Sequence, residues 1–207
     1  MMIPVLFADE AMLVVVKPHR LLSVPGLGAE KQDCLWRRVQ QQYPTARIVH
    51  RLDYATSGLM VMALTAVTHR HLSMQFQNRI TKKRYQAVVS GQIHENEGSI
   101  ELPLRCDWER RPLQIVDHEK GKSALTHWQC LERNDQGSRL LLHPITGRSH
   151  QLRVHLQAIG HPILGDEFYA EGKAREASTR LLLHADQLAL QHPLREEWLA
   201  FESACPF

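Results

Sequence analysis

The alternation of apolar and polar positions along the chain predicts more strands than helices. Residues 5–8 and 13–17 are apolar runs on either side of Asp9 and Glu10, a spacing that predicts a hairpin. The run at 59–64 is wholly apolar and follows Gly58, which is typical of a buried strand entered through a tight loop. Further strands are predicted at residues 85–90, 123–132 and 138–142, with one strand or a pair of strands at 181–190.

Helical spacing of apolar residues, bounded by capping or breaking residues, predicts helices over residues 33–43, 65–79 and 149–159. Asp33 and Thr65 are the predicted N-caps of the first two. Because strands outnumber helices and short turns join several of them, we expect an α+β fold with a mixed, mostly antiparallel central sheet and flanking helices. The apolar residues expected on the buried sides of the first two helices are Leu35, Trp36, Val39, Val67, Leu72 and Phe76.

The composition is ordinary for a globular protein. Of 207 residues, 43% are hydrophobic and 23% charged, enough for one sizeable core or two small lobes. No apolar stretch approaches the roughly 20 residues that span a bilayer, and the N-terminus lacks a basic leader, so we expect a cytoplasmic protein without membrane attachment. The cysteines lack CxxC spacing and are expected to be free thiols. They are Cys34, Cys106, Cys130 and Cys205.

The charge is distributed unevenly. A net charge of +3 and a pI of about 8.8 are weak evidence for an acidic partner. Runs of basic residues are usually solvated faces, and they become candidate phosphate contacts only beside a nucleotide-modifying signature. The clusters are Lys82, Lys83 and Arg84; Arg105, Arg110 and Arg111; and Arg148 with Arg153.

One short segment carries candidate chemistry. Residues 50–58 read His-Arg-Leu-Asp-Tyr-Ala-Thr-Ser-Gly and place the carboxylate of Asp53 on the loop before the apolar run. A carboxylate held ionised in a cleft beside Arg51 would act as a nucleophile or a base. The alternative is a structural loop in which Asp53 caps backbone N–H groups and pairs with Arg51, and structural ion pairs outnumber catalytic ones.

The order of residues in this segment resembles the signature of the RluA-type pseudouridine synthases, which isomerise uridine to pseudouridine within RNA. Further blocks resemble the family in the same order, including Lys-Lys-Arg-Tyr-Gln-Ala at 82–87 and Thr-Gly-Arg-Ser-His-Gln-Leu-Arg-Val-His at 146–155. The other matching blocks are residues 14–26, 161–166 and 181–185.

The resemblance implies the pseudouridine synthase catalytic fold, with a bent central sheet and a cleft between two lobes. Because Lys17 and Pro18 of the first block lie so near the start, we expect residues 1–207 to form a single catalytic domain without a separate N-terminal RNA-binding domain. The short length and Cys-Asp-Trp at 106–108 are most similar to the family's founding subgroup. Members of that subgroup modify both a large-subunit ribosomal RNA and tRNA anticodon stem-loops.

By the same resemblance, the catalytic residues are Asp53, Tyr85 and Arg153. Asp53 is the catalytic carboxylate, and whether it attacks the sugar, attacks the base or removes a sugar proton stays open. Arg153 is expected to pair with Asp53 and keep it charged. The ring of Tyr85 is expected to stack on the uracil, and its hydroxyl to help remove the C5 proton.

The target base must leave its stack to be modified, and the resemblance assigns residues to that step. Arg51 is expected to fill the vacated stack, and Leu182 or Leu183 to form an apolar wall opposite Tyr85, with a plain core leucine as the alternative for either. The predicted substrate-binding residues are Arg51, Lys82, Lys83, Arg148, His150, Leu182 and Leu183.

The 13 histidines raise the question of a metal site. No HExxH or His-x3-His pair is present, and the isomerisation needs no redox change or group donor, so we expect no metal and no cofactor. We expect RNA as the partner, no obligate protein partner and a monomer. The competing hypotheses are a catalytically idle RNA-binding module and a metal-dependent phosphodiesterase.

Overall fold

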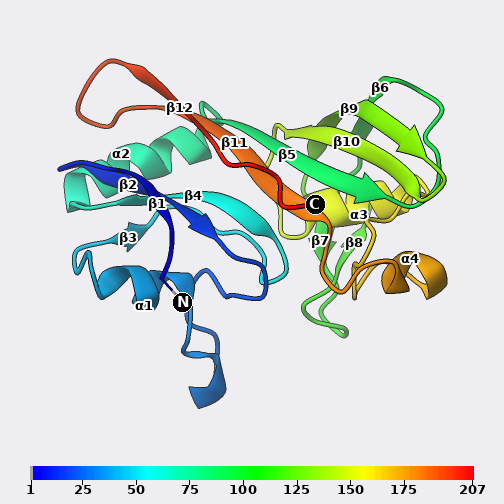
Figure 1. The fold of residues 1–207 in the computed structure, drawn as a ribbon, viewed down its shortest axis with the longest axis horizontal. Coiled ribbons are helices and arrows are strands. Elements are labelled where there is room, and N and C mark those ends of the chain that lie inside the picture. The colour runs from blue at the N-terminus through cyan, green and yellow to red at the C-terminus, as the bar shows by residue number, and fades with distance from the viewer. Residues whose placement is uncertain (1) are drawn as a thin grey trace. The chain divides into compact units, whose positions relative to one another are not determined.

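The computed structural model describes residues 2–207 and divides the chain into two compact units. The first unit comprises the chain up to Lys83 together with Ala185–Pro206, and the second comprises Arg84–His184 with Phe207. Apart from the assignment of Phe207, the chain crosses from one unit to the other within strands, since β5 (Lys82–Val89) and β11 (Leu183–Gln191) each begin in one unit and end in the other. Figure 1 shows the succession of elements along the chain.

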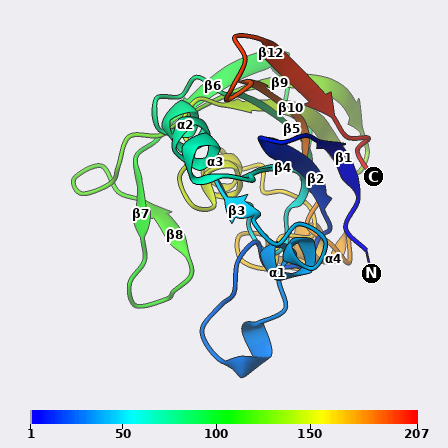
Figure 2. The same cartoon turned by 90° about the vertical axis from the view of Figure 1, so that its left-hand side faces the viewer.

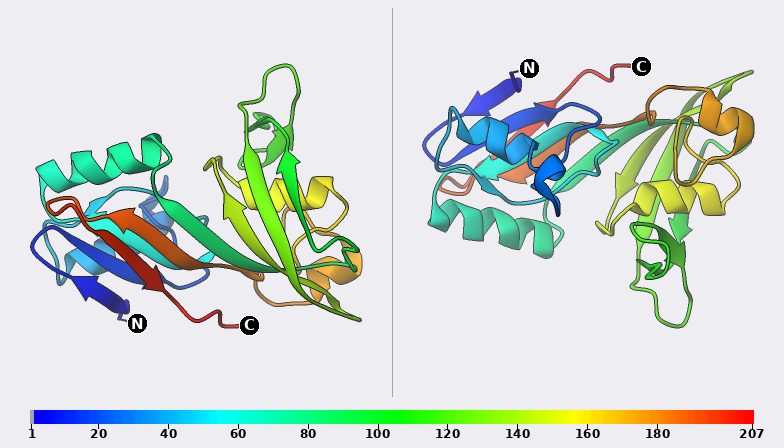
Figure 3. Two further views of the ribbon diagram at one scale, coloured as in Figure 1. Left: turned by 90° about the horizontal axis from the view of Figure 1, so that it is seen from above. Right: turned by 90° about the horizontal axis from the view of Figure 1, so that it is seen from below.

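The first unit is a sheet flanked by helices. Its strands follow the order β1-β2-β4-β11, with β12 paired to β11 and the short β3 paired to β4. The helix α2 packs against β4, as Figure 3 shows. The elements not yet given bounds are β1 (Val5–Ala8), β2 (Met12–Lys17), β3 (Arg47–Ile48), β4 (Ser57–Ala63), β12 (Trp198–Glu202), the 3₁₀ helix η1 (Ala29–Lys31), α1 (Leu35–Gln40) and α2 (Ala66–Gln77).

The second unit is built on an antiparallel sheet in the order β5-β10-β9-β6. A separate hairpin of β7 and β8 projects from it (Figure 2), and the base of this hairpin packs on α3 through Leu104 and Val154. The elements are β6 (Glu97–Glu101), β7 (Leu104–Cys106), β8 (Gln114–Val116), β9 (Leu125–Asn134), β10 (Gly137–Pro144), α3 (Gln151–Ala158) and α4 (Gly172–Glu176).

The core of the first unit explains the continuous apolar run at 59–64. Every residue of β4 is buried, so this strand has no solvent face and needs no polar alternation. On one side its residues join a cluster with β2, α2 and β11. The buried members of the cluster are Ala11, Met12, Val14, Leu59, Val61, Ala63, Leu72, Leu188 and Leu190.

Most predicted elements are confirmed. The hairpin of β1 and β2 is present, and its turn is held by Asp9, whose Oδ1 accepts from the N–H groups of Ala11 and Met12. Thr65 caps α2 in a capping box with Thr68. The predicted strands at 123–132 and 138–142 are β9 and β10, joined by a tight turn at Asp135. The α+β class with a mixed sheet is therefore confirmed.

Several local predictions were wrong. Asp33 does not cap the first helix; Cys34 is its N-cap, and the Asp33 carboxylate instead accepts from the Arg38 side chain. That helix ends at Gln40 rather than Tyr43. Val67 was expected on a buried face but is 70% exposed, because the buried face of α2 is formed by Thr68, Leu72 and Gln75, and the neighbouring position 67 points away from it.

Several short elements were not predicted at all. β3, β6, β7, β8, β12 and α4 were not predicted from the sequence. The four cysteines are free thiols, as expected. Within residues 2–207, no helix combines the length and apolar character needed to cross a membrane.

Candidate active site

Asp53 lies in the loop that leads from β3 into β4. Its side chain is half-buried, between the buried Leu52 and Tyr54, which is 47% exposed. The N–H of Thr56 donates to the carbonyl of Asp53 at 3.2 Å and closes a turn at this point. The loop therefore places one carboxylate at the boundary between the interior of the first unit and its surface.

Two buried polar side chains hold the main chain on either side of Asp53. Ser23 Oγ donates to the carbonyl of Leu52 at 2.7 Å and accepts from the N–H of Leu52 at 3.1 Å. Lys17, which is fully buried, donates to the carbonyl of Tyr54 at 3.3 Å. The same ammonium donates to the carbonyls of Pro18 and Leu21 at 2.9 and 2.8 Å.

Gly58, the second residue of β4, adopts a backbone conformation that other residues avoid. Its φ is +123°, and a Cβ built there would lie 2.3 Å from the carbonyl oxygen of Ala185. Main chain of β4 thus approaches main chain of β11 more closely than any side chain permits. This contact explains why a glycine stands where the loop enters the buried strand.

His50, at the other end of the segment, is held as a neutral imidazole. Its ring stacks on Phe76 with centroids 4.3 Å apart, and its Nε2 accepts from the N–H of Val61 at 3.1 Å. Burial, followed by the charge of Lys83, lowers the pKa of His50 to about 3. Burial, followed by the charge of Arg79, lowers the pKa of Lys83 to about 8. A hydrogen-bond acceptor at Nε2 agrees with the uncharged form.

Arg153 is buried in the second unit and does not lie on the surface. It is 2% exposed, and its Nε and Nη2 contact the Asp166 carboxylate at 2.8 and 2.6 Å. Asp166 is fully buried. The grouping of Arg153 with Arg148 as a surface phosphate cluster was therefore wrong: burying a guanidinium requires a paired acid, and Asp166 is that acid.

Asp166 also organises the aromatic residues beside Arg153. Its Oδ1 accepts from the N–H groups of Phe168 and Tyr169, and both rings lie 5.1 Å from the guanidinium carbon. The hydroxyl of Tyr169 accepts from the N–H of Gln114 and lies 2.6 Å from Nδ1 of His150. His150, at φ +51°, is thus tied through Tyr169 to the same cluster as Arg153.

Tyr85 and the two candidate leucines lie in the second unit as well. Tyr85 is half-buried on β5, opposite Leu142 of β10. Leu182 is half-buried, and its carbonyl accepts from the N–H of Val88 on β5. Leu183 is 3% exposed, as a core leucine is. The side chain of Leu182 is therefore the more accessible of the two to a ligand.

The predicted phosphate contacts differ in their surroundings. Lys82 is exposed, with its ammonium 5.6 Å from the centre of the Trp198 ring, whereas Lys83 is half-buried. Arg148 Nε donates to the carbonyl of Ser123 at 3.1 Å. In the middle cluster, Arg105 is paired with Asp117 and Arg110 with Asp107, which weakens the expectation that these two arginines contact phosphates.

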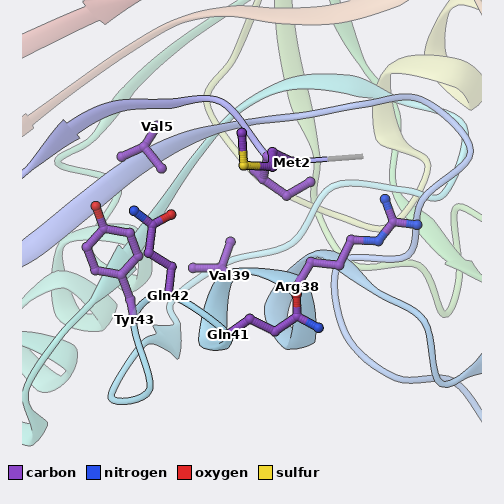
Figure 4. Close-up of a pocket in the computed structure, with 8 residues that line it drawn as sticks. Met2, Val5, Arg38, Val39, Gln41, Gln42 and Tyr43 are labelled. Carbon is purple, nitrogen blue, oxygen red and sulfur yellow. The ribbon is translucent and has the colours of Figure 1, made fainter.

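One cavity is lined by none of these residues. It has a volume of about 320 Å³ and lies between the N-terminal segment and α1, as Figure 4 shows. None of its lining residues was predicted as a site residue. They are Met2, Ile3, Val5, Arg38, Val39, Gln41, Gln42 and Tyr43.

Comparison with known proteins identifies the family. Residues 11–158 match the model of the RNA pseudouridylate synthases, and the match covers most of the chain. The chain belongs to the RNA pseudouridylate synthase family. Members of this family are isomerases that act on RNA, so the enzyme class expected from the sequence is confirmed.

The relatives are similar over nearly their whole length. The chain is 55% identical over 190 residues to the dual-specificity RNA pseudouridine synthase RluA of Yersinia pestis, covering 91% of this chain and 92% of the relative. It is 49% identical over 204 residues to the protein of the same name from Escherichia coli, covering 98% and 93%. The solved structure of human RNA pseudouridylate synthase domain containing 1 is 30% identical, with a TM-score of 0.82 over 99% of this chain and 84% of that one.

Within this pseudouridylate synthase, each unit holds part of the predicted site. Asp53, Arg51, Lys82 and Lys83 belong to the first unit, and the remaining predicted residues belong to the second. The pairing of Asp53 with Arg153 stays a prediction. Sequence reasoning missed Asp166 as the buried partner of Arg153, although Asp166 ends one of the blocks that resemble the family. It also missed Ser23, which lies inside another of those blocks.

Proposed function

We propose that this protein isomerises specific uridines to pseudouridine in structured RNA loops, in both large-subunit ribosomal RNA and tRNA anticodon stem-loops. The observation that carries the proposal is the Asp53 loop: a half-buried carboxylate whose two neighbours in the chain are fixed by buried side chains. Family membership supports the reaction. The name dual-specificity RNA pseudouridine synthase, which the similar bacterial proteins carry, supports the two classes of RNA.

The reaction breaks the N1–C1′ glycosidic bond, turns the uracil, joins C5 to C1′ and releases the proton from C5. In this proposal Asp53 is the catalytic carboxylate, and Arg153 pairs with it and favours its charged form. Tyr85 stacks on the uracil, and its hydroxyl assists removal of the C5 proton. The bonds broken and formed balance without an oxidant, a group donor or a metal.

Base flipping brings the target nucleoside to Asp53. Arg51, which is exposed, fills the vacated place in the stack with its planar guanidinium. Leu182 or Leu183 supplies the apolar wall opposite Tyr85, and the accessibility of Leu182 favours that residue. Lys82, Lys83, Arg148 and His150 are the proposed contacts to the RNA backbone and the flipped nucleotide.

We further propose that residues 1–207 act as one catalytic domain, as a monomer in the cytoplasm, with RNA as the only obligate partner. The two compact units are then the lobes of this one domain.

The test is release of tritium from RNA labelled at C5 of uridine, measured on a tRNA anticodon stem-loop and on a large-subunit ribosomal RNA fragment. We expect release from both RNAs, unchanged by EDTA and abolished in Asp53→Asn. Asp135→Asn is the matched control, because Asp135 is an exposed carboxylate in the turn between β9 and β10.

Each alternative function has its own outcome in this assay. RNA binding without tritium release identifies the idle binding module. Loss of activity with EDTA, together with RNA cleavage, identifies the phosphodiesterase. Release that survives Asp53→Asn rejects Asp53 as the catalytic group, and release from only one RNA rejects the dual specificity.

A further inference from the structure

Ser23 makes an unusual pair of contacts with the residue that precedes Asp53. Its single hydroxyl donates to the carbonyl of Leu52 at 2.7 Å and accepts from the N–H of Leu52 at 3.1 Å. Ser23 is 4% exposed and Leu52 is 9% exposed, so water does not replace these bonds readily. Both main-chain polar groups of Leu52 therefore depend on one side chain that is 29 positions away in sequence.

Ser23 is itself held in place by a helix. At the start of α1, the N–H of Leu35 donates to the carbonyl of Leu22 at 2.7 Å, and the N–H of Trp36 donates to the carbonyl of Ser23 at 3.2 Å. These N–H groups at a helix start lack partners within the helix, so residues 22 and 23 satisfy them. The contacts form a continuous path from α1 through Ser23 to Leu52, and so to Asp53.

From this geometry we propose that Ser23 is a positioning residue for Asp53, an inference that rests on the proposed function. Ser23 acts through the main chain: by fixing the peptide groups of Leu52 it sets where the Cα of Asp53 lies and which way its carboxylate points. Without the hydroxyl, a buried N–H and a buried carbonyl must find new partners, and the loop shifts to reach them. A shift of about 1 Å in a catalytic group lowers a rate by roughly 100-fold.

The test separates the chemical step from RNA binding. Single-turnover tritium release and the Kd for a labelled anticodon stem-loop are measured for wild type and Ser23→Ala. We expect the rate at saturating enzyme to fall by about 10- to 100-fold, with the Kd within about twofold of wild type. Ser23→Cys, which keeps a similar size but forms weaker hydrogen bonds, is expected to lie between the two and serves as the measured variant if Ser23→Ala does not fold.

The chain supplies a matched control for general destabilisation. Ser138 Oγ also accepts from a main-chain N–H, that of Ile93 at 3.0 Å, and donates to a main-chain carbonyl, that of Gly91 at 3.1 Å. It is fully buried and belongs to the second unit, whereas the Asp53 loop belongs to the first. Ser138→Ala is expected to lower Tm by an amount similar to Ser23→Ala while leaving the single-turnover rate within about twofold of wild type.

Two results overturn the proposal. The first is a rate within twofold of wild type in folded Ser23→Ala, or in Ser23→Cys if that is the measured variant. The second is an equal loss of rate in Ser138→Ala, which attributes the effect to destabilisation. Failure of the proposed function is distinct, because it shows as no release by wild type or as release by Asp53→Asn. If wild type releases no tritium, the role of Ser23 is rejected together with the proposed function. If Asp53→Asn still releases tritium, Asp53 is not the catalytic carboxylate and Ser23 has none to position.

Discussion

The loop of Asp53 and the surroundings of Arg153 are stabilised in different ways. Around Asp53 the anchors act on the main chain, through Ser23 and Lys17, and the residue is half-buried. Around Arg153 the anchor acts on the side chain, through a carboxylate that contacts two guanidinium nitrogens, and both partners are buried. The half-buried acid is thus positioned by hydrogen bonds to the main chain of its neighbours, whereas the buried guanidinium of Arg153 is held directly by the opposite charge of a carboxylate.

The largest expected effect is on the side-chain anchor. Asp166→Asn removes the negative charge that faces buried Arg153, and breaking one side of a buried ion pair costs about 3–5 kcal/mol of unfolding free energy. Urea unfolding measures it. In an Arg153→Met background the same Asp166→Asn change is expected to cost much less, because no buried cation remains. Equal costs in the two backgrounds would contradict an energetic coupling between these residues.

The next prediction concerns Gly58, at the start of β4, where the Asp53 loop joins the strand. Gly58→Ala places a side chain at φ +123° and against the carbonyl of Ala185, and the backbone strain alone costs about 1–3 kcal/mol. We expect a lower Tm and a lower single-turnover rate, because relief of the clash displaces the loop. Gly160→Ala is the control: φ is +86° there, but no atom lies within 4 Å of the new Cβ. Equal rate losses in both variants would remove the close approach to Ala185 as the cause.

The neutral His50 makes stability depend on pH. Its pKa is about 3 in the folded protein and near 6.5 when unfolded, so below pH 6.5 the unfolded chain binds a proton that the folded chain does not. Unfolding free energy should therefore fall with decreasing pH, by up to about 1.4 kcal/mol per unit between pH 6 and 5. Gln at position 50 retains an acceptor for Val61 without titrating, so His50→Gln should flatten this slope. An unchanged slope would show that the pKa of His50 does not differ between the folded and unfolded states.

The smallest expected effect concerns the helix that supports His50. Thr65→Ala removes the N-cap of α2 and should cost about 1 kcal/mol of unfolding free energy. Phe76 of α2 stacks on His50, so a weaker α2 also weakens this contact in the first unit, while the contact of Arg153 with Asp166 in the second unit is unaffected. Thermal unfolding measures the loss of stability, and hydrogen exchange compares the protection of the backbone amides around His50 with that around Arg153. Thr65→Ser, which keeps the capping hydroxyl, should remain within a few tenths of a kcal/mol of wild type. An equal loss of amide protection around His50 and around Arg153 would indicate that the two units unfold together.

Local patterns predicted the elements whose signals lie within a few residues. The N-cap at Thr65, the turn at Asp9 and the apolar run of β4 all involve neighbours in sequence, and all are confirmed. The prediction failed where local signals compete. Asp33 has the chemistry of an N-cap, but a guanidinium five residues away at Arg38 offers a stronger, charged partner.

The sequence by itself determined the family, the α+β class and the identity of the candidate catalytic residues, because these depend on residue order and on local periodicity. Only the tertiary structure decided how those residues are held. The contact of Ser23 with Leu52 joins positions 29 apart, the buried charge of Arg153 is balanced by Asp166, and β12 forms by pairing with β11. Hydrogen bonds and ion pairs between distant segments depend on which groups burial brings together, and no local pattern carries that information.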